Sequence, residues 1–306
     1  MSPALSGHGY RMRLGLLRRA RSGHATLCER LASSSSASTA FGARLFTNSS
    51  FDSVDAEEIR RFGRLSSQWA NEEDSFKALH SFNQIRVPWI VDSITKADPD
   101  QQEQLAGIRL VDVGCGGGLL SIPLARLGAS LCGIDASEEA VRAACIAVSS
   151  AFHASPPKCG EIHLECSTVE KFAETNASGF DAVVASEIVE HVANVDTFIK
   201  ACVRLARGGA PLFFTTINKT LASRIFAVWM AEVLVPFLYR PEVFGAVPSG
   251  VHDWSKFIEP EVLRHKLESN GCDVRLVHGI AYNPFANKWS WTDCTAINYA
   301  LMAVKR

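Results

Sequence analysis

The sequence predicts an α/β fold in which a mostly parallel sheet carries helices on both faces. From residue 108 onward, short β-rich runs alternate with helical stretches, which is typical of right-handed β-α-β units. The last two β-rich runs, at 272–280 and 296–304, are separated by a loop instead of a helix. Two strands joined in this way predict an antiparallel pair at one edge of the sheet.

The first 50 residues have a composition of their own. They contain seven Arg, no Lys and a single acid, Glu29, together with a serine run at 33–36. A leader that is rich in arginine and serine and poor in acids is typical of an organelle import sequence. A secretory signal would need a long apolar stretch, and these residues contain none. We therefore expect a mitochondrial transit peptide over residues 1–50, with a disordered basic tail as the alternative.

The remaining residues, 51–306, carry 24 basic and 31 acidic side chains. Because this part has no excess of basic residues with which to bind phosphates, we expect no nucleic-acid partner. Nine cysteines are scattered along the chain and no two of them form a C-x-x-C pair, so disulfide frameworks and zinc knuckles are both disfavoured. A reducing compartment such as the mitochondrial matrix fits this pattern.

Helical and β-rich runs then follow one another in order. We expect approach helices between 55 and 97, of which 76–94 is the clearest, and Pro99 marks the break after them. Strands are predicted at 108–113, 130–135, 161–166, 180–186 and 211–218, and helices at 118–128, 138–152, 195–206 and 259–271. The last helix is ended by Gly271, a usual residue just beyond a helix C-terminus.

Three glycines, Gly114, Gly116 and Gly118, stand between a predicted strand and a predicted helix, and Asp135 ends the next strand. Glycines let the backbone come close to a ligand, and an acid in this place accepts hydrogen bonds from ribose hydroxyls. The dinucleotide-binding pattern needs a small residue where this chain has Leu119. The observed pattern, D-x-G-x-G-x-G, resembles motif I of class I S-adenosylmethionine-dependent methyltransferases, and NAD binding is the alternative.

Glu187, Glu190 and His191 are crowded into the stretch directly after the strand at 180–186. If the chain leaves the sheet in a helical turn, they share one face at the carboxyl edge of the sheet, where ligands bind in open α/β folds. Two carboxylates and an imidazole favour a hard divalent ion such as Mg²⁺ or Mn²⁺ over zinc. Two alternatives stay open: His191 is a general base that the acids orient, or all three residues cap the next helix.

Several motifs resemble those of the ubiquinone-biosynthesis O-methyltransferases of mitochondria. They are "FKALHSFNQIR" (76–86), "LVDVGCGGGLLSIPLARLGASLCGID" (110–135), "FDAVVASEIVEHV" (180–192), "GGAPLFFTTINKT" (208–220), "VPSGVHDWSKFIEPE" (247–261), "YNPF" (282–285) and "NYALMAV" (298–304). The resemblance covers the chain from about residue 55 to its end. It implies a Rossmann-like class I methyltransferase fold, with a seven-stranded, mostly parallel sheet and an antiparallel edge strand.

The resemblance also implies roles for residues at matching positions. Contacts with S-adenosylmethionine would come from Arg86, Gly114, Asp135 and Ser186. Glu187, Glu190 and His191 would bind Mg²⁺, in preference to Mn²⁺ or Zn²⁺, and Glu190 and His191 would be catalytic. The implied acceptors are catechol hydroxyls of polyprenylated ubiquinone precursors, namely 3,4-dihydroxy-5-polyprenylbenzoate and demethylubiquinol. The implied partners are other ubiquinone-biosynthesis proteins in a complex, and the matrix side of the mitochondrial inner membrane, as a peripheral attachment.

An apolar run occupies residues 224–240, interrupted by Glu232 and Pro236. It falls short of the roughly 20 apolar residues of a spanning helix. We expect either a buried helix or an apolar lid over 221–250 that faces the membrane and admits a polyprenyl tail. The stretch 236–246 is longer than the family pattern suggests. Two other functions stay open: a methyltransferase for a soluble small phenol, and a non-catalytic lipid-binding scaffold.

Overall fold

The computed structural model describes residues 53–66, 76–95, 103–154, 160–224 and 254–306. The expected transit peptide at 1–50 lies outside these residues, as do most of the expected apolar lid at 221–250 and all of 236–246. In the described part of the chain, none of the helices combines the length and the apolarity that crossing a bilayer requires.

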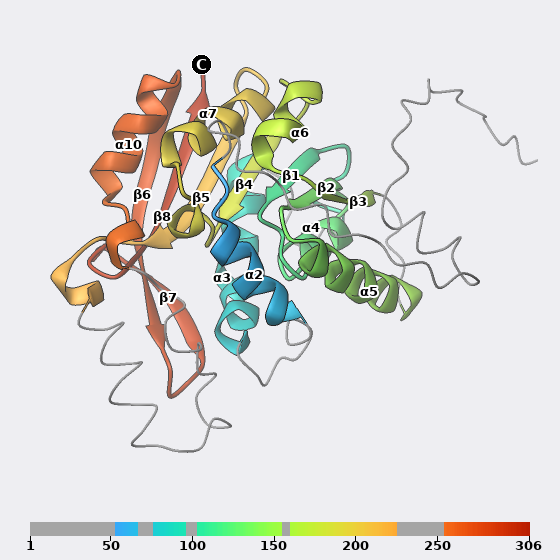
Figure 1. Ribbon diagram of the computed structural model, residues 1–306, viewed down its shortest axis with the longest axis horizontal. Coiled ribbons are helices and arrows are strands. Elements are labelled where there is room, and N and C mark those ends of the chain that lie inside the picture. The colour runs from blue at the N-terminus through green and yellow to red at the C-terminus, as the bar shows by residue number, and fades with distance from the viewer. Residues whose placement is uncertain (1–52, 67–75, 96–102, 155–159, 225–253) are drawn as a thin grey trace, which may run out of the picture.

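Within the described residues, one mixed sheet of eight strands forms the centre of the fold (Figure 1). Its strands, in spatial order, are β3 (Glu161–Cys166), β2 (Ser130–Asp135), β1 (Arg109–Val113), β4 (Ala182–Ser186), β5 (Pro211–Ile217), β8 (Asn298–Lys305), β6 (Cys272–Asn283) and β7 (Lys288–Thr292). The first five are parallel, whereas β8 runs antiparallel to both β5 and β6, and β7 runs antiparallel to β6. The predicted fold class, with its antiparallel edge, is therefore confirmed.

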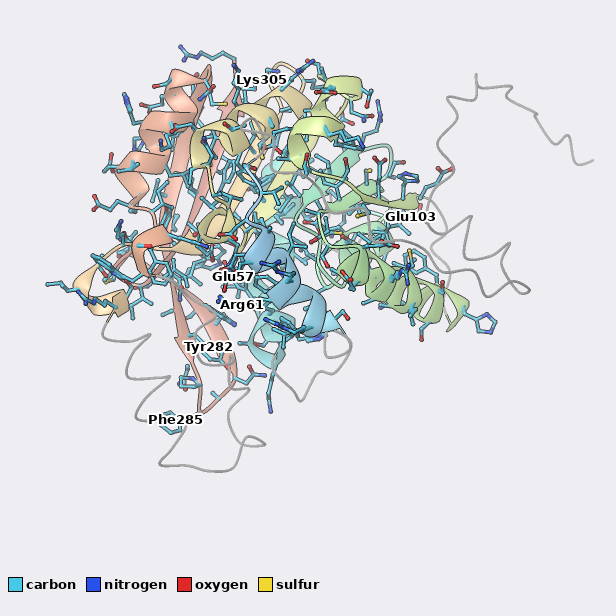
Figure 2. The ribbon with its side chains drawn as sticks, viewed as in Figure 1. Glu57, Arg61, Glu103, Tyr282, Phe285 and Lys305 are labelled. Carbon is cyan, nitrogen blue, oxygen red and sulfur yellow. The ribbon has the colours of Figure 1, made fainter. Side chains whose placement is uncertain are left out.

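The sheet has one strand more than the expected seven, because the segment predicted as a loop between the last two strands forms a hairpin. The side chain of Asn283 accepts hydrogen bonds from the backbone N–H groups of Phe285 and Ala286, which closes the turn between β6 and β7. Side chains of this kind commonly stabilise tight turns in place of a backbone partner. The hairpin projects from the body of the domain, with Phe285 at its tip (Figure 2).

Helices cover both faces of the sheet. They are α2 (Ala56–Arg64), α3 (Lys77–Ile94), α4 (Ser121–Arg126), α5 (Glu138–Ala154), α6 (Val169–Thr175), α7 (Val195–Leu205) and α10 (Pro260–Ser269), with short 3₁₀ turns at Val189–His191 and Trp254–Lys256. Alternate strand residues point to opposite faces. Val111, Val183 and Leu212 pack with α6, α7 and α10, while Leu110, Val184 and Phe213 pack with α3 and α4. Both faces are therefore buried, as expected for parallel strands.

The hairpin braces α3 against the sheet. Trp289 of β7 donates a hydrogen bond from Nε1 to the carbonyl oxygen of Ala78 at 2.7 Å, and its ring packs on Phe82 with 4.7 Å between centroids. Further along α3, the side chain of Asn83 donates to the carbonyl oxygen of Leu119 at 2.8 Å. These contacts fix α3 relative to the glycine loop and so determine where the next turn of the helix, with Arg86, lies.

Among the described cysteines, six are free thiols and Cys145 is disulfide-bonded. This bond departs from the expectation that disulfides are disfavoured, which rested on the absence of C-x-x-C pairs, because a disulfide depends on which cysteines the fold brings together and not on their spacing in the sequence.

Replacing Phe213 by alanine tests the packing between the sheet and α3. Phe213 is 1% exposed and meets Trp89 edge to face at 5.1 Å between ring centroids. We expect Phe213→Ala to lower the free energy of unfolding by about 3–5 kcal/mol, because it leaves a cavity in the core. Phe285→Ala, at a side chain that is 88% exposed, is the matched control and should change it by less than about 0.5 kcal/mol. Equal losses in urea unfolding would contradict this packing.

Candidate active site

The glycine loop after β1 has a backbone that only glycine adopts easily. Gly114, Gly116 and Gly118 have φ angles of 76°, 51° and 82°, in the left-handed region that is strained for other residues. At Gly114 space is limiting as well, since an added Cβ would lie 2.8 Å from Cγ1 of Ile188. The loop thus packs directly against the segment that follows β4.

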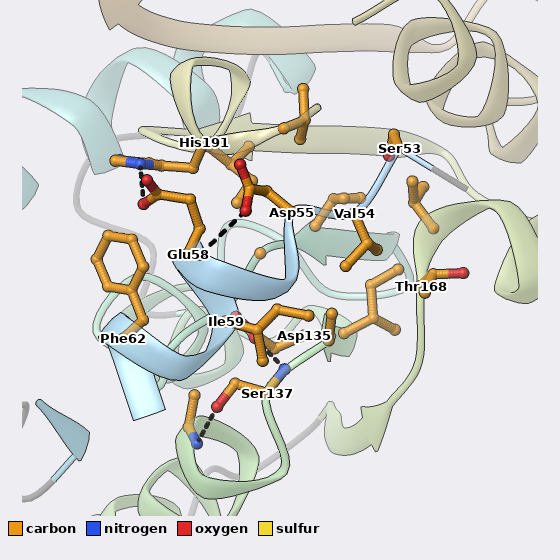
Figure 3. A pocket seen from close by; sticks show the side chains of 18 of the residues that line it. Ser53, Val54, Asp55, Glu58, Ile59, Phe62, Asp135, Ser137, Thr168 and His191 are labelled. Atoms are coloured by element: carbon orange, nitrogen blue, oxygen red, sulfur yellow. Dashed lines mark hydrogen bonds and ion pairs between the residues drawn. The ribbon is translucent and has the colours of Figure 1, made fainter. Parts of the chain in front are cut away.

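Asp135 at the end of β2 faces this loop. Its Oδ2 accepts a hydrogen bond from the backbone N–H of Gly116 at 2.9 Å, and its Oδ1 accepts one from the N–H of Ser137 at 2.8 Å. Burial raises the pKa of Asp135, and these two hydrogen bonds oppose the rise. Asp135, Gly114 and Gly116 line one cavity (Figure 3), which is where the sequence predicted the ribose-binding acid and the loop to meet.

The cavity reaches Glu187, the first residue after β4. Glu187 has a φ of 55°, which is uncommon for a residue with a side chain, and its backbone N–H donates to the carbonyl oxygen of Thr215 at 2.9 Å. Burial and the nearby carboxylate of Glu190 raise the pKa of Glu187 to about 7, although Thr215, Arg86 and His191 lower it. Two carboxylates are therefore crowded at this edge of the sheet.

Glu190 and His191 follow in the 3₁₀ turn Val189–His191, and both are buried. Oε2 of Glu190 accepts a hydrogen bond from the Thr216 hydroxyl at 2.7 Å, while its Oε1 has no hydrogen-bond partner among the described residues. Nδ1 of His191 lies 3.1 Å from Oε2 of Glu58. The helical turn covers only Val189–His191, because Glu187 has a left-handed backbone, and the side chains of Glu190 and His191 have different hydrogen-bond partners.

A divalent ion fits this site in its chemistry. Oε1 of Glu190 is a buried carboxylate oxygen without a hydrogen bond in the described structure, and its carboxylate is crowded against that of Glu187. Oxygen ligands of this kind suit a hard cation. Across the described residues, however, no group of three or more His, Cys, Asp or Glu side chains is gathered for a metal ion. Glu187, Glu190 and His191 are thus near one another, but their side chains do not converge on one point that a metal ion could occupy.

Arg86 and Ser186 lie together but are not among the described residues that line the cavity. The guanidinium of Arg86 donates to the Ser186 hydroxyl at 2.7 Å and to Oδ1 of Asn83. Burial lowers the pKa of Arg86 to about 10, against the opposing effect of Glu187 and Asp112. Their predicted contact with the methyl donor therefore stays a prediction, whereas Arg86 and Ser186 do meet each other.

Helix α2 covers the cavity, and its role was missed by sequence reasoning. The cavity that Gly114 and Gly116 line is also lined by residues at the start of α2 and along it, namely Val54, Asp55, Glu58, Ile59 and Phe62 (Figure 3). The available signal was local: Asp55 is an N-cap residue whose side chain accepts from the N–H groups of the first turn, which holds two further acids. That signal marks where the helix begins, and it says nothing about where the helix packs.

A comparison of two glycines tests the close approach of the loop. We expect Gly114→Ala to weaken binding of S-adenosylmethionine at least about tenfold, because the left-handed backbone costs roughly 1–2 kcal/mol and the methyl group also collides with Ile188. Gly107 has a φ of 81° with nothing within 4 Å of an added Cβ, so Gly107→Ala carries the strain without the collision. Calorimetric titration should show unchanged donor affinity for Gly107→Ala. Equal affinities in the two variants would contradict the role of the loop.

Comparisons with known proteins agree with this geometry. The family model described as "Methyltransferase domain" matches residues 111–214. The chain is 41% identical over 265 residues to the mitochondrial ubiquinone biosynthesis O-methyltransferase of Homo sapiens, covering 86% of this chain and 68% of the relative. It is 38% identical over 254 residues to the ubiquinone biosynthesis O-methyltransferase of a Methylobacterium species, covering 82% of this chain and 95% of the relative.

A solved structure supports the fold. The structure of magnesium protoporphyrin IX methyltransferase from Synechocystis with bound SAH matches with a TM-score of 0.52 at 19% identity, over 82% of this chain and 93% of that one. Identity at this level shows a shared fold. The identities to the curated relatives extend over most of the chain and show more. This chain belongs to the family of ubiquinone biosynthesis O-methyltransferases, and it is an S-adenosylmethionine-dependent O-methyltransferase.

Proposed function

We propose that the enzyme methylates catechol hydroxyls of polyprenylated ubiquinone precursors, 3,4-dihydroxy-5-polyprenylbenzoate and demethylubiquinol. The observation that carries this proposal is the position of His191, whose imidazole lines the same cavity as Gly114 and Asp135. A proton acceptor beside the donor cavity is what methylation of a phenolic hydroxyl needs. The names of the relatives supply the pathway, and the polyprenylated catechol is our inference from that pathway.

His191 is suited to act as the base. The carboxylate of Glu58 at Nδ1 favours the tautomer that carries its proton there, so the lone pair is on Nε2. A phenolic hydroxyl has a pKa of about 10, and forming the phenolate near pH 7 costs about 4 kcal/mol. As His191 accepts the hydroxyl proton, the acceptor oxygen attacks the methyl carbon. The carbon–sulfur bond of the sulfonium breaks, and S-adenosylhomocysteine leaves.

Metal assistance is the alternative form of the proposal, in which Nε2 of His191 binds the ion and is not the base. Mg²⁺, in preference to Mn²⁺ or Zn²⁺, would be held by Glu187, Glu190 and His191. When bound there, the ion would supply positive charge that favours an ionised catechol oxygen. The supporting observations are the crowded carboxylates and the unpartnered Oε1 of Glu190 within the described structure. Glu190, which is buried, is proposed as catalytic through this role.

We also propose a location on the matrix side of the mitochondrial inner membrane, with other ubiquinone-biosynthesis proteins as partners. The arginine-rich leader and the mammalian relatives, which are named as mitochondrial enzymes, support the organelle. The apolar run at 224–240 supports contact with a membrane that holds the polyprenyl tail.

Methylation assays with two acceptors test the substrate class and the base. The full chain should methylate 3,4-dihydroxybenzoate that carries a polyprenyl chain with a higher kcat/KM than unprenylated 3,4-dihydroxybenzoate. His191→Ala should lower kcat about 100-fold or more, with donor affinity nearly unchanged, because only the proton acceptor is lost. His163→Ala removes an exposed histidine of β3 and should leave kcat as in the wild type. A preference for the unprenylated acid would favour the soluble-phenol alternative, and failure to bind the donor would favour the scaffold.

Binding of Mn²⁺, followed by electron paramagnetic resonance, tests the metal without relying on turnover. We expect one tightly bound ion per chain, and loss of that ion in Glu187→Gln combined with Glu190→Gln, because two of the three proposed ligands lose their charge. The control pair, Glu161→Gln with Glu165→Gln, removes two carboxylates from β3 and should keep the ion. Equal binding by both double variants, or full activity after removal of metal by EDTA, would contradict the proposed site.

A further inference from the structure

We propose that Glu58 and Lys256 are positioning residues that fix the imidazole of His191 from outside the catalytic segment. Glu58 holds Nδ1 of His191, and Lys256 holds Glu58. The inference rests on the proposed function, in which His191 is the base. It assigns a role to helix α2, and to the lysine of the sequence motif "VHDWSKFI", neither of which the donor site or the acidic cluster explains.

The carboxylate of Glu58 is fixed on both of its oxygens. Oε2 lies 3.1 Å from Nδ1 of His191, while Oε1 accepts hydrogen bonds from Arg61 at 3.2 Å and from Nζ of Lys256 at 3.3 Å. Glu58 is buried, so its charge is costly unless it is paired. Because both oxygens have partners, the carboxylate has little freedom to turn away from the imidazole.

Lys256 connects two distant parts of the chain at this point. Its Nζ also donates to Oδ2 of Asp55 at 2.7 Å, and Asp55 is the N-cap residue of α2. Lys256 therefore holds the cap and the first turn of α2 together. The lysine itself is anchored, because Phe257 and Ile258 are buried and the indole of Trp254 donates to the carbonyl oxygen of Thr220 at 3.0 Å.

Phe62 restrains the imidazole on a second side. It follows Glu58 by one helical turn, so both side chains project from the same face of α2. The ring of Phe62 meets that of His191 edge to face, with 4.8 Å between centroids and 79° between planes (Figure 3). A hydrogen bond at Nδ1 and a ring contact at its side leave the imidazole one favoured orientation. That orientation determines where Nε2 points, and a base must meet the hydroxyl proton within hydrogen-bond reach.

A different role for α2 would be to cover the methyl donor and nothing more. The two roles differ in what a substitution changes. Loss of a cover weakens donor binding, whereas loss of orientation at His191 lowers kcat at saturating donor and leaves donor affinity unchanged. Glu57 supplies a matched control, because it is the neighbouring carboxylate of the same helical turn and is exposed at the outer side of α2 (Figure 2).

The test uses the full chain with S-adenosylmethionine and the prenylated dihydroxybenzoate. We expect Glu58→Ala to lower kcat at least about tenfold, with donor affinity within about twofold of the wild type, while Glu57→Ala changes neither. Lys256→Ala should lower kcat by a smaller factor, and Lys256→Arg should restore it, since a guanidinium can also bridge two carboxylates. Equal kcat in Glu58→Ala and Glu57→Ala would overturn the proposal, as would weaker donor binding at unchanged kcat.

A second readout needs no turnover. The side-chain nitrogen signals of His191 in NMR report which ring nitrogen carries the proton. We expect a proton on Nδ1 in the wild type and in Glu57→Ala, and a mixture of tautomers in Glu58→Ala and, to a lesser degree, in Lys256→Ala. Identical signals in all variants would overturn the positioning role even if the enzyme is active. If His191→Ala keeps full turnover, the proposed base is wrong, while the nitrogen signals still decide whether Glu58 orients the ring.

Discussion

The hydrogen bond between Glu58 and His191 joins two parts of the chain that lie 133 residues apart. One is helix α2, which lines one side of the cavity, and the other is the turn that follows β4. The glycine loop and Asp135 form the inner wall, and Ile188 packs against Gly114 where the two walls meet. The cavity is therefore bounded by the start of the domain and by the carboxyl edge of its sheet, and the contact between Glu58 and His191 joins these two parts.

Several charged side chains are buried at the carboxyl edge of the sheet, where burial of a charge is energetically unfavourable. Glu187, Glu190 and Arg86 lie close together in a region shielded from water, and Glu187 has a backbone conformation that is unfavourable for its residue type. Burial of this kind normally requires a partner for each charge, and strained residues tend to persist where function needs them. Thr215 and Thr216 of β5 supply hydroxyls to the two carboxylates. A dication would complete the set, which is why the crowding itself supports a metal.

The fold followed from the sequence because its signals are local. Alternating strands and helices, the glycines between β1 and α4, and Asp135 at the end of β2 all appear where they were predicted. The hairpin strand β7 was missed, since "KWSWT" is short and its pairing depends on a turn that the side chain of Asn283 closes. The site was predicted only on its inner wall. Glu58 is 133 residues from His191 and 198 residues from Lys256 in the sequence. Contacts between such distant residues depend on tertiary packing and cannot be predicted from local sequence spacing.

The central claim is that His191 takes the proton of the acceptor hydroxyl beside the methyl donor. The most direct measurement is a crystal structure of the enzyme with S-adenosylhomocysteine and a prenylated dihydroxybenzoate. We expect Nε2 of His191 to lie within about 3.2 Å of the reacting hydroxyl, or one water away, with that oxygen directed at the sulfur of the bound product. An acceptor ring bound with its hydroxyls on the far side of Glu187, out of reach of the imidazole, would contradict it.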